Sequence, residues 1–365
     1  MSNIKDEINS LEDAVESNDI SKLFNIKFNV EQYSQLPPKI VLTLPRFAPQ
    51  RIQGENVDLF GNLSSSSITS DEHGYSMKTI QKSPEAGSSP PVKQLLDEPE
   101  IVTIIDAKYK YYIDNVACLN EEEIWTSGDI SVMKLFSINQ GSILKSITTK
   151  SSFSQAHIAV NQSGGLLYTD HRDRTVNIVK NKDIEEVIRL ENWRINGVCS
   201  SFSGDLLVIM YSDDDNQSKL VRYSKSTEKQ SIQFDDDGKP LYSCGPSNKD
   251  INENKNLDIT VADWGAKRVV VVNKAGKLRF MYTGNTPAPK NKPFFPRGIT
   301  TDSQSHILTI DYYNDCIHII DQDGVFLRYL NCRLIDPHGL CTDTNDNLFI
   351  AECRNKQVKK IKYQK

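Results

Sequence analysis

Short apolar runs separated by turn residues fill the C-terminal part of the chain. Residues 297–323, RGITTDSQSHILTIDYYNDCIHIIDQD, contain three such runs, and a fourth, Val325 to Leu330, follows the turn at residues 322–324. Runs this short, rich in β-branched residues and broken by Asp, Asn, Ser and Gly, are typical of antiparallel strands in a meander. The pattern predicts one small sheet of four strands in about forty residues.

The same pattern recurs along the chain. Residues 337–363, PHGLCTDTNDNLFIAECRNKQVKKIKY, again give a Gly-hydrophobic strand, an Asp-Asn turn and a hydrophobic strand that ends in an acid. The acid is Glu352 here and Asp311 in the preceding unit, 41 residues earlier, and Asp263 and Asp170 hold this position further upstream. A period of this length is typical of propellers and solenoids. Six units begin near Val116, Ile158, Val198, Ile251, Gly298 and Gly339, and the fourth carries an insertion around Asp235 to Asp250.

The two ends of the repeat region indicate how it closes. The sixth unit stops after its third strand near Tyr363, and an unassigned apolar strand, Ile101 to Ile105, precedes the first unit. If this strand pairs as the outer strand of the last sheet, the ring is closed and no repeat edge stays open. The sequence therefore predicts an all-β, six-bladed β-propeller over residues 99–365, closed by strand 101–105.

These units resemble NHL repeats, which combine a Gly-hydrophobic strand, a strand ending in Asp and a Val-rich third strand. The chain resembles the C-terminal NHL propeller of the tripartite-motif (TRIM) proteins, together with the end of their coiled coil. Three units depart from the pattern, with Ser127, Met210 and Glu352 in place of Asp. WD-repeat propellers fit less well because no Gly-His and Trp-Asp pair recurs.

The first hundred residues have a different composition. Ile4, Ile8, Leu11 and Val15 form an a/d seam, which predicts a helix over residues 1–25. This helix either packs on its own domain or is the end of a coiled coil that supports weak self-association through residues 4–23. Residues 26–98 are predicted to be an extended and Ser/Pro-rich flexible linker without a core.

Charge and cysteine content narrow the class of protein. The formal net charge of −5 gives no general indication of nucleic-acid binding, although a single face can still be basic. No apolar run approaches the roughly 20 residues of a membrane-spanning helix, and the N-terminus is too charged for a signal peptide. We expect a cytoplasmic protein without a membrane partner.

The seven cysteines of the chain contain no C-x-x-C motif. They are interpreted as reduced thiols in the core, and the alternative is a disulfide such as Cys332 with Cys341.

The sequence does not predict catalysis. TRIM ubiquitin ligases use a zinc-binding RING followed by B-boxes, and these need closely spaced Cys and His ligands. No cysteine precedes Cys118, and His73 is the single histidine in the first hundred residues, so we expect the RING and B-boxes to be absent.

Propeller hydrolases and lyases hold a metal on carboxylates and Asn near the axis. The first strands here offer mainly apolar and Thr residues, and His157, His318 and His338 show no ligand spacing. We therefore expect no catalytic residues, no metal and no cofactor.

One face of the predicted propeller combines cations with aromatic rings. Loops that join second to third strands, and loops between blades, emerge on the same side of a propeller. They contain the predicted partner-binding residues Arg172, Arg174, Trp193, Arg194, Trp264, Lys267, Arg268, Phe295, Arg297, Tyr312, Tyr313, Asn314, His338, Arg354 and Lys356.

This composition has two functional interpretations. Tyr, Trp and Arg are the usual anchors of protein interfaces, whereas Arg and Lys between rings also suit single-stranded RNA. Some NHL propellers bind RNA on this face, but acids such as Asp129, Asp173 and Asp315 would weaken a field that attracts phosphate. A face without a specific site is the third alternative, and the repeat acids are expected to brace turns.

The resemblance implies a non-catalytic recognition module, similar to the substrate-binding NHL propeller of TRIM ubiquitin ligases. Such a module would bind a protein partner and support ubiquitin-dependent regulation. Single-stranded RNA binding in post-transcriptional regulation is the alternative, and a propeller hydrolase or lyase is a second alternative.

Overall fold

The computed structural model describes residues 93–365 apart from 130, 152–155 and 181–182, together with four short strands further upstream. The chain divides into two compact units, Met1–Ser88 and Ser89–Lys365. In the first unit β1 (Lys39–Leu42) pairs with β4 (Ile68–Asp71), and β2 (Phe47–Ala48) pairs with β3 (Asn62–Leu63). The predicted helix over residues 1–25, self-association through residues 4–23, and most of the predicted linker fall outside the described residues.

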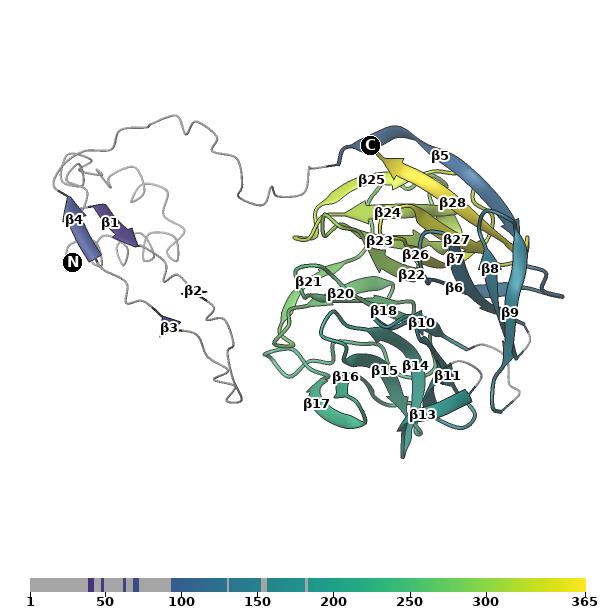
Figure 1. Cartoon of the computed structure of the whole chain (residues 1–365), viewed down its shortest axis with the longest axis horizontal. Coiled ribbons are helices and arrows are strands. Elements are labelled where there is room, and N and C mark those ends of the chain that lie inside the picture. The colour runs from purple at the N-terminus through teal and green to yellow at the C-terminus, as the bar shows by residue number, and fades with distance from the viewer. Residues whose placement is uncertain are drawn as a thin grey trace, which may run out of the picture. The chain divides into compact units, whose positions relative to one another are not determined.

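The second unit contains six four-stranded antiparallel sheets, here called blades 1 to 6 (Figure 1). Blade 1 is β6 (Ile113–Cys118), β7 (Glu123–Gly128), β8 (Val132–Ser137) and β9 (Ser142–Thr148); blade 2 is β10 (Ile158–Val160), β11 (Leu166–Asp170), β12 (Thr175–Lys180) and β13 (Asp183–Arg189). Blade 3 is β14 (Trp193–Ser200), β15 (Leu206–Ser212), β16 (Ser218–Ser224) and β17 (Thr227–Ile232); blade 4 is β18 (Lys249–Glu253), β19 (Ile259–Asp263), β20 (Arg268–Val272) and β21 (Leu278–Tyr282). Blade 5 is β22 (Pro296–Thr301), β23 (Ile307–Asp311), β24 (Cys316–Ile320) and β25 (Phe326–Leu330); blade 6 is β26 (Pro337–Thr342), β27 (Leu348–Glu352), β28 (Gln357–Gln364) and β5 (Leu95–Asp106).

The first strands of the blades form a closed ring, because each of β6, β10, β14, β18, β22 and β26 contacts the first strand of the next blade. The predicted all-β, six-bladed propeller is confirmed. Within the part of the chain that the structure describes, the helical content is a 3-10 turn at Tyr312–Asn314. The same residues form no helix that is long and apolar enough to cross a membrane.

The core lies between neighbouring blades. In β20, Val269 and Val271 pack toward blade 5, while Val270 and Val272 pack toward blade 3. Successive side chains of a strand point to opposite faces, so a continuous valine run supplies two interfaces at once. This explains why the run Val269 to Val272 of β20 is apolar throughout and does not alternate with polar residues.

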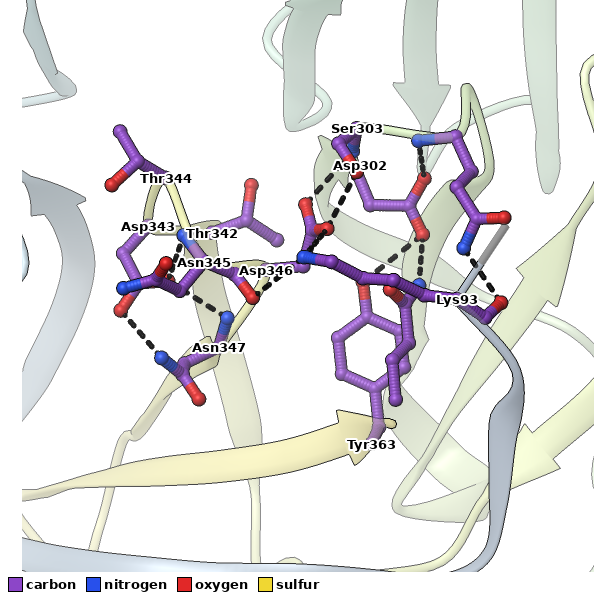
Figure 2. A network of polar contacts seen from close by, with 12 residues as sticks. Lys93, Asp302, Ser303, Thr342, Asp343, Thr344, Asn345, Asp346, Asn347 and Tyr363 are labelled. Atoms are coloured by element: carbon purple, nitrogen blue, oxygen red, sulfur yellow. Dashed lines mark hydrogen bonds and ion pairs between the residues drawn. The ribbon is translucent and has the colours of Figure 1, made fainter. Parts of the chain in front are cut away.

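The ring closes by pairing the start of the described propeller with its end. β5 pairs antiparallel with β28, from Leu95 opposite Gln364 to Asp106 opposite Gln357. The strand is longer than the predicted segment 101–105. Its beginning is held by Lys93, whose Nζ lies 2.6 Å from Asp346 Oδ2 in blade 6 (Figure 2). The outer edge of blade 6 therefore comes from the opposite end of the propeller sequence.

A recurrent brace joins the turn between the second and third strands of a blade to the loop that enters the blade. The amide of Tyr312 donates to the Phe295 carbonyl at 3.0 Å, and the amide of Trp264 donates to the Asn248 carbonyl at 3.1 Å. The repeat acid strengthens this contact: Asp263 accepts from the amide of Ser243 at 2.6 Å and from the amide of Ala266 at 3.1 Å. The repeat acids thus brace turns, as the sequence predicts, and the two sets of loops share one face. We call it the 2–3 face, and the opposite one the 1–2 face.

The insertion predicted around residues 235–250 is part of the propeller. Phe234 and Pro240 form an isolated β-bridge, and Leu241 and Tyr242 are buried in the core between blades 3 and 4. The segment then runs to the 2–3 face, where Pro246 lines a cavity described below.

Candidate functional site

An aromatic cluster lies on the 2–3 face where the loops of blades 4 and 5 meet. It consists of Trp264, Phe295, Tyr312 and Tyr313. The Trp264 ring centroid is 4.9 Å from that of Phe295 and 5.2 Å from that of Tyr312. Tyr313 packs edge-on against Phe295 at 4.8 Å and remains 46% exposed. Four rings from three separate loops therefore form one partly exposed apolar surface.

Two cations border the aromatic cluster. Arg297, at the start of β22, lies with its guanidinium carbon 5.4 Å from the ring centroids of both Trp264 and Tyr312. The Lys267 ammonium lies 4.7 Å from the centre of the Phe295 ring. Among the residues that the structure describes, no carboxylate lies within salt-bridge distance of Arg297 or Lys267. Lys267 thus stays available to an anionic group of a ligand, and Arg297 does so only in part, because its Nη1 already contacts the His338 imidazole.

The predicted residues of blades 2 and 3 form a separate group. Arg174 and Arg194 both bind Asp213, at 2.7 Å and 3.1 Å. Trp193 packs under the ammonium of Lys219, 4.4 Å from its ring centre. Arg172 is exposed. Two of these three arginines therefore share one acid, which offsets half of their combined charge.

The remaining predicted residues make contacts within the propeller, although the Arg354 side chain stays 81% exposed. The guanidinium of Arg354 lies 3.3 Å from Asp336, that of Arg268 donates to the Leu241 carbonyl, and Lys356 donates to the Lys110 carbonyl. Asn314 is buried, and its amide donates to Asp311 at 2.7 Å. Its side chain supports the turn that carries Tyr312 and Tyr313.

An axial pocket of about 490 Å³ opens beside the aromatic cluster on the same face. Arg297 and His338, both from the predicted set, line it together with residues that the sequence analysis did not select. These are Tyr112, Asp114, His157, Thr169, His171, Ile195, Asn196, Tyr211, Pro246, Asn248 and Cys353. This end of the axis is thus lined mainly by polar residues, which the sequence analysis did not predict. Toward the 1–2 face the first strands do present the expected apolar and Thr residues, such as Val116, Thr300 and Thr342.

The charged groups of the axial pocket are paired across blades. Asp114 Oδ1 and Arg297 Nη1 each lie 2.7 Å from His338 Nδ1, which joins blades 1, 5 and 6. Burial opposes ionisation of Asp114, but the hydrogen bond from His338 and the charge of Arg297 outweigh it and lower the pKa of Asp114 to about 2. Asp114 is therefore an anion at neutral pH, and it offsets part of the charge of Arg297.

His157 is paired in the same way on the other side of the axis. Its Nε2 lies 3.0 Å from Asp250 Oδ1, and Asp250 also accepts from the amide of Gly298 at 2.9 Å. Burial opposes protonation of His157, but the charge and hydrogen bond of Asp250 outweigh it and raise the pKa of His157. These inward-facing residues escaped prediction because each is an isolated polar residue at the start of a first strand. Only the ring brings them together.

Two groups of side chains have the residue types and proximity of metal ligands, namely Asp311, Cys316 and His318, and Asp336, His338 and Cys353. In the first group Asp311 already accepts from Asn314, and His318 Nδ1 lies 2.8 Å from the Tyr282 hydroxyl. In the second group His338 is engaged with Asp114 and Arg297. Both groups are explained by contacts within the fold.

Comparison with known proteins gives the fold alone. No family model and no curated protein matches the chain. Among solved structures, it is similar to the calcium-binding protein regucalcin from Agrobacterium tumefaciens, with a TM-score of 0.55, 10% identity, and coverage of 72% of this chain and 94% of that chain. A putative gluconolactonase gives a TM-score of 0.54 at 13% identity, with coverage of 75% and 93%.

A catalytically inactive virginiamycin B lyase from Staphylococcus aureus gives a TM-score of 0.50 at 13% identity, with coverage of 68% of this chain and 80% of that chain. At these identities the likeness extends to the β-propeller architecture and not to chemistry. The function must be inferred from the site of this chain.

Proposed function

We propose that the propeller is a non-catalytic recognition module that binds a segment of a partner protein on the aromatic cluster. The observation that carries this proposal is the exposed group of four rings bordered by Arg297 and Lys267. Aromatic residues and arginine are the residues most often found as binding hot spots. The partner segment places an apolar side chain on Tyr313 and an acidic group beside the two cations.

The pairing of the cations favours protein over single-stranded RNA. Binding of RNA depends on neutralising successive phosphates, so its strength grows with the number of unpaired Lys and Arg along the path. On this face Arg174 and Arg194 share Asp213, and Arg354 lies beside Asp336. The cations of the predicted set that have no carboxylate beside them among the described residues are spread over the face, and two of them, Arg297 and Lys267, meet at the aromatic cluster, which suits one or two acidic side chains.

The resemblance to TRIM proteins of the NHL class belongs to the same proposal. In it, the propeller is the substrate receptor of a ubiquitin-dependent pathway in the cytoplasm, and the ligase chemistry resides in another domain or chain.

A selection from a random peptide display library on the full chain tests the proposal. Enriched peptides are then titrated against the Tyr313→Ala variant and against Tyr111→Ala as a matched control. Tyr111 is 63% exposed and lies in a loop of the same face, outside the aromatic cluster. We expect Tyr313→Ala to weaken binding about tenfold or more, as loss of a hot-spot residue does, and Tyr111→Ala to leave it unchanged.

A parallel titration with a random single-stranded RNA pool addresses the alternative. RNA binding that falls steeply with salt, and that is lost in Arg297→Gln, would replace the protein partner by RNA. Peptides that bind both tyrosine variants equally would place the site elsewhere on the propeller. Either result overturns the proposal.

A further inference from the structure

Two cysteines meet at the junction between the first and the last blade. Cys118 ends β6 of blade 1, and Cys341 lies near the end of β26 of blade 6. Their Sγ atoms are 2.7 Å apart, although the residues are separated by 223 positions in the sequence. A disulfide bond is about 2.05 Å long, so the two sulfurs are within a small movement of bonding.

The close approach of the two strands has a local cause. Gly339 lies two residues before Cys341, and a Cβ built on it would come 2.8 Å from both Asn115 Cα and the Asp114 carbonyl oxygen. Only a residue without a side chain allows β26 to lie this close to β6. The glycine thus brings Cys341 against Cys118 through the same backbone contact that closes the ring.

The two thiols face a cavity of about 360 Å³ that lies on the axis toward the 1–2 face, and both are partly exposed. None of the other five cysteines, all of which lie among the described residues, makes a sulfur–sulfur contact. Burial, the neighbouring thiol of Cys341 and the charge of Asp343 raise the pKa of Cys118, although Lys360 opposes the effect. Because the thiolate is the reactive form, this environment slows oxidation and keeps the pair reduced in the absence of an oxidant.

We propose that Cys118 and Cys341 are an oxidisable dithiol that closes the propeller covalently when a low-molecular-weight disulfide such as oxidised glutathione is in excess. One cysteine thiolate attacks a sulfur of the oxidised glutathione, forming a mixed disulfide and releasing one glutathione thiolate. The second cysteine thiolate then attacks the protein sulfur of the mixed disulfide and releases the second glutathione. Two electrons pass from the protein to the oxidant, and the two cysteine protons end on the two glutathione thiols.

The bond would add a covalent link at the place where the ring is joined. In the reduced protein, the first and last blades are held by the packing of β6 on β26 and by the pairing of β5 with β28. A disulfide across a long loop restricts the unfolded chain strongly. We expect oxidation to raise the thermal unfolding midpoint by about 5 to 10 °C.

Peptide mapping of the full chain tests the proposal without relying on a variant. Reduced protein is incubated with excess oxidised glutathione at mildly alkaline pH, blocked by alkylation and digested with trypsin without reduction. We expect tryptic peptides 111–134 and 334–354 to be joined, and the number of thiols that can be alkylated after unfolding to fall from seven to five.

Three serine variants complete the test. Cys118→Ser and Cys341→Ser should lose both the linked peptide and the rise in midpoint on oxidation. Cys244→Ser, which removes an exposed thiol elsewhere, should keep both. A map that shows Cys341 bound only to glutathione, or linked to another cysteine such as Cys332, would overturn the proposal. A linked pair with an unchanged midpoint would overturn its role in ring closure.

Discussion

At the scale of single residues, a buried acid at the end of the second strand shapes the 2–3 face. Asp263 is fully buried and accepts two hydrogen bonds from Ser243, at 2.6 Å and 2.5 Å, and one from Ala266. Glu352 does the same for the amide of Ile335 at 2.7 Å. The acid fixes the loop that carries the binding residues, and its carboxylate oxygens are occupied by these hydrogen bonds.

Replacing this acid should therefore cost stability. Asp263→Ala leaves the half-buried amide of Ser243 and the amide of Ala266 without their acceptor, and we expect the free energy of unfolding to fall by about 2 to 3 kcal/mol. Asp237→Ala is the matched control, because the Asp237 side chain is 76% exposed. Its effect should stay within about 0.5 kcal/mol. Chemical denaturation of both variants measures the difference, and equal values would contradict the bracing role.

At the scale of elements, β5 combines a buried and an exposed face. Ile105 is 2% exposed and belongs to the core between blades 6 and 1, whereas its neighbour Ile104 is 49% exposed. The strand thus fills the outer position of blade 6 and seals an apolar core that blade 6 shares with blade 1. β5 is therefore held in two ways, by its backbone pairing with β28 and by the burial of Ile105 in the core. These two contacts explain why β5 lies beside β28 although the two strands are far apart in the sequence.

The two adjacent isoleucines offer a matched test of this closure. Ile105→Ala removes buried methyl groups and should lower the free energy of unfolding by about 2 to 4 kcal/mol. Ile104→Ala, with the same change of side chain on the outer face, should change it by less than about 0.5 kcal/mol. If thermal melts of the two variants coincide, β5 does not contribute to the core as described.

At the scale of the whole molecule, the axis is held by histidine–aspartate contacts that cross between blades. His157 of blade 2 binds Asp250 of blade 4, and His338 of blade 6 binds Asp114 of blade 1. Neither pair can form within one repeat, so these contacts exist only in the closed ring. The pair of His157 and Asp250 makes the stability of the propeller dependent on pH.

The sign of this dependence follows from the raised pKa of His157. A histidine whose pKa is higher in the folded state stabilises the protein fully below its ordinary pKa of about 6.5, and this contribution is lost as the pH rises through the folded value. We expect the difference in melting temperature between the wild type and His157→Gln to be larger at pH 6 than at pH 9. A difference that is independent of pH would show that His157 contributes through packing alone.

The repeat pattern was sufficient to predict the fold. A period of about forty residues, a fixed order of short strands and a spare strand before the first unit indicate six blades and a closed ring, because the spare strand completes the last sheet and leaves no repeat edge open. The 2–3 face was predicted for the same reason, since it depends on strand order alone. Within it, Trp264, Phe295, Arg297 and Tyr312 do come together.

The sequence by itself thus determined the class of fold, the face on which the loops gather and the acids that brace them, because each depends on local order repeated along the chain. The tertiary structure alone decided which cations are paired with an acid, as with Arg174 and Arg194 on Asp213. It also decided the polar lining of the axis and the meeting of Cys118 with Cys341 across 223 positions. These features depend on the closure of the ring. Closure brings residues of distant repeats into contact, and nothing in their local sequence indicates these contacts.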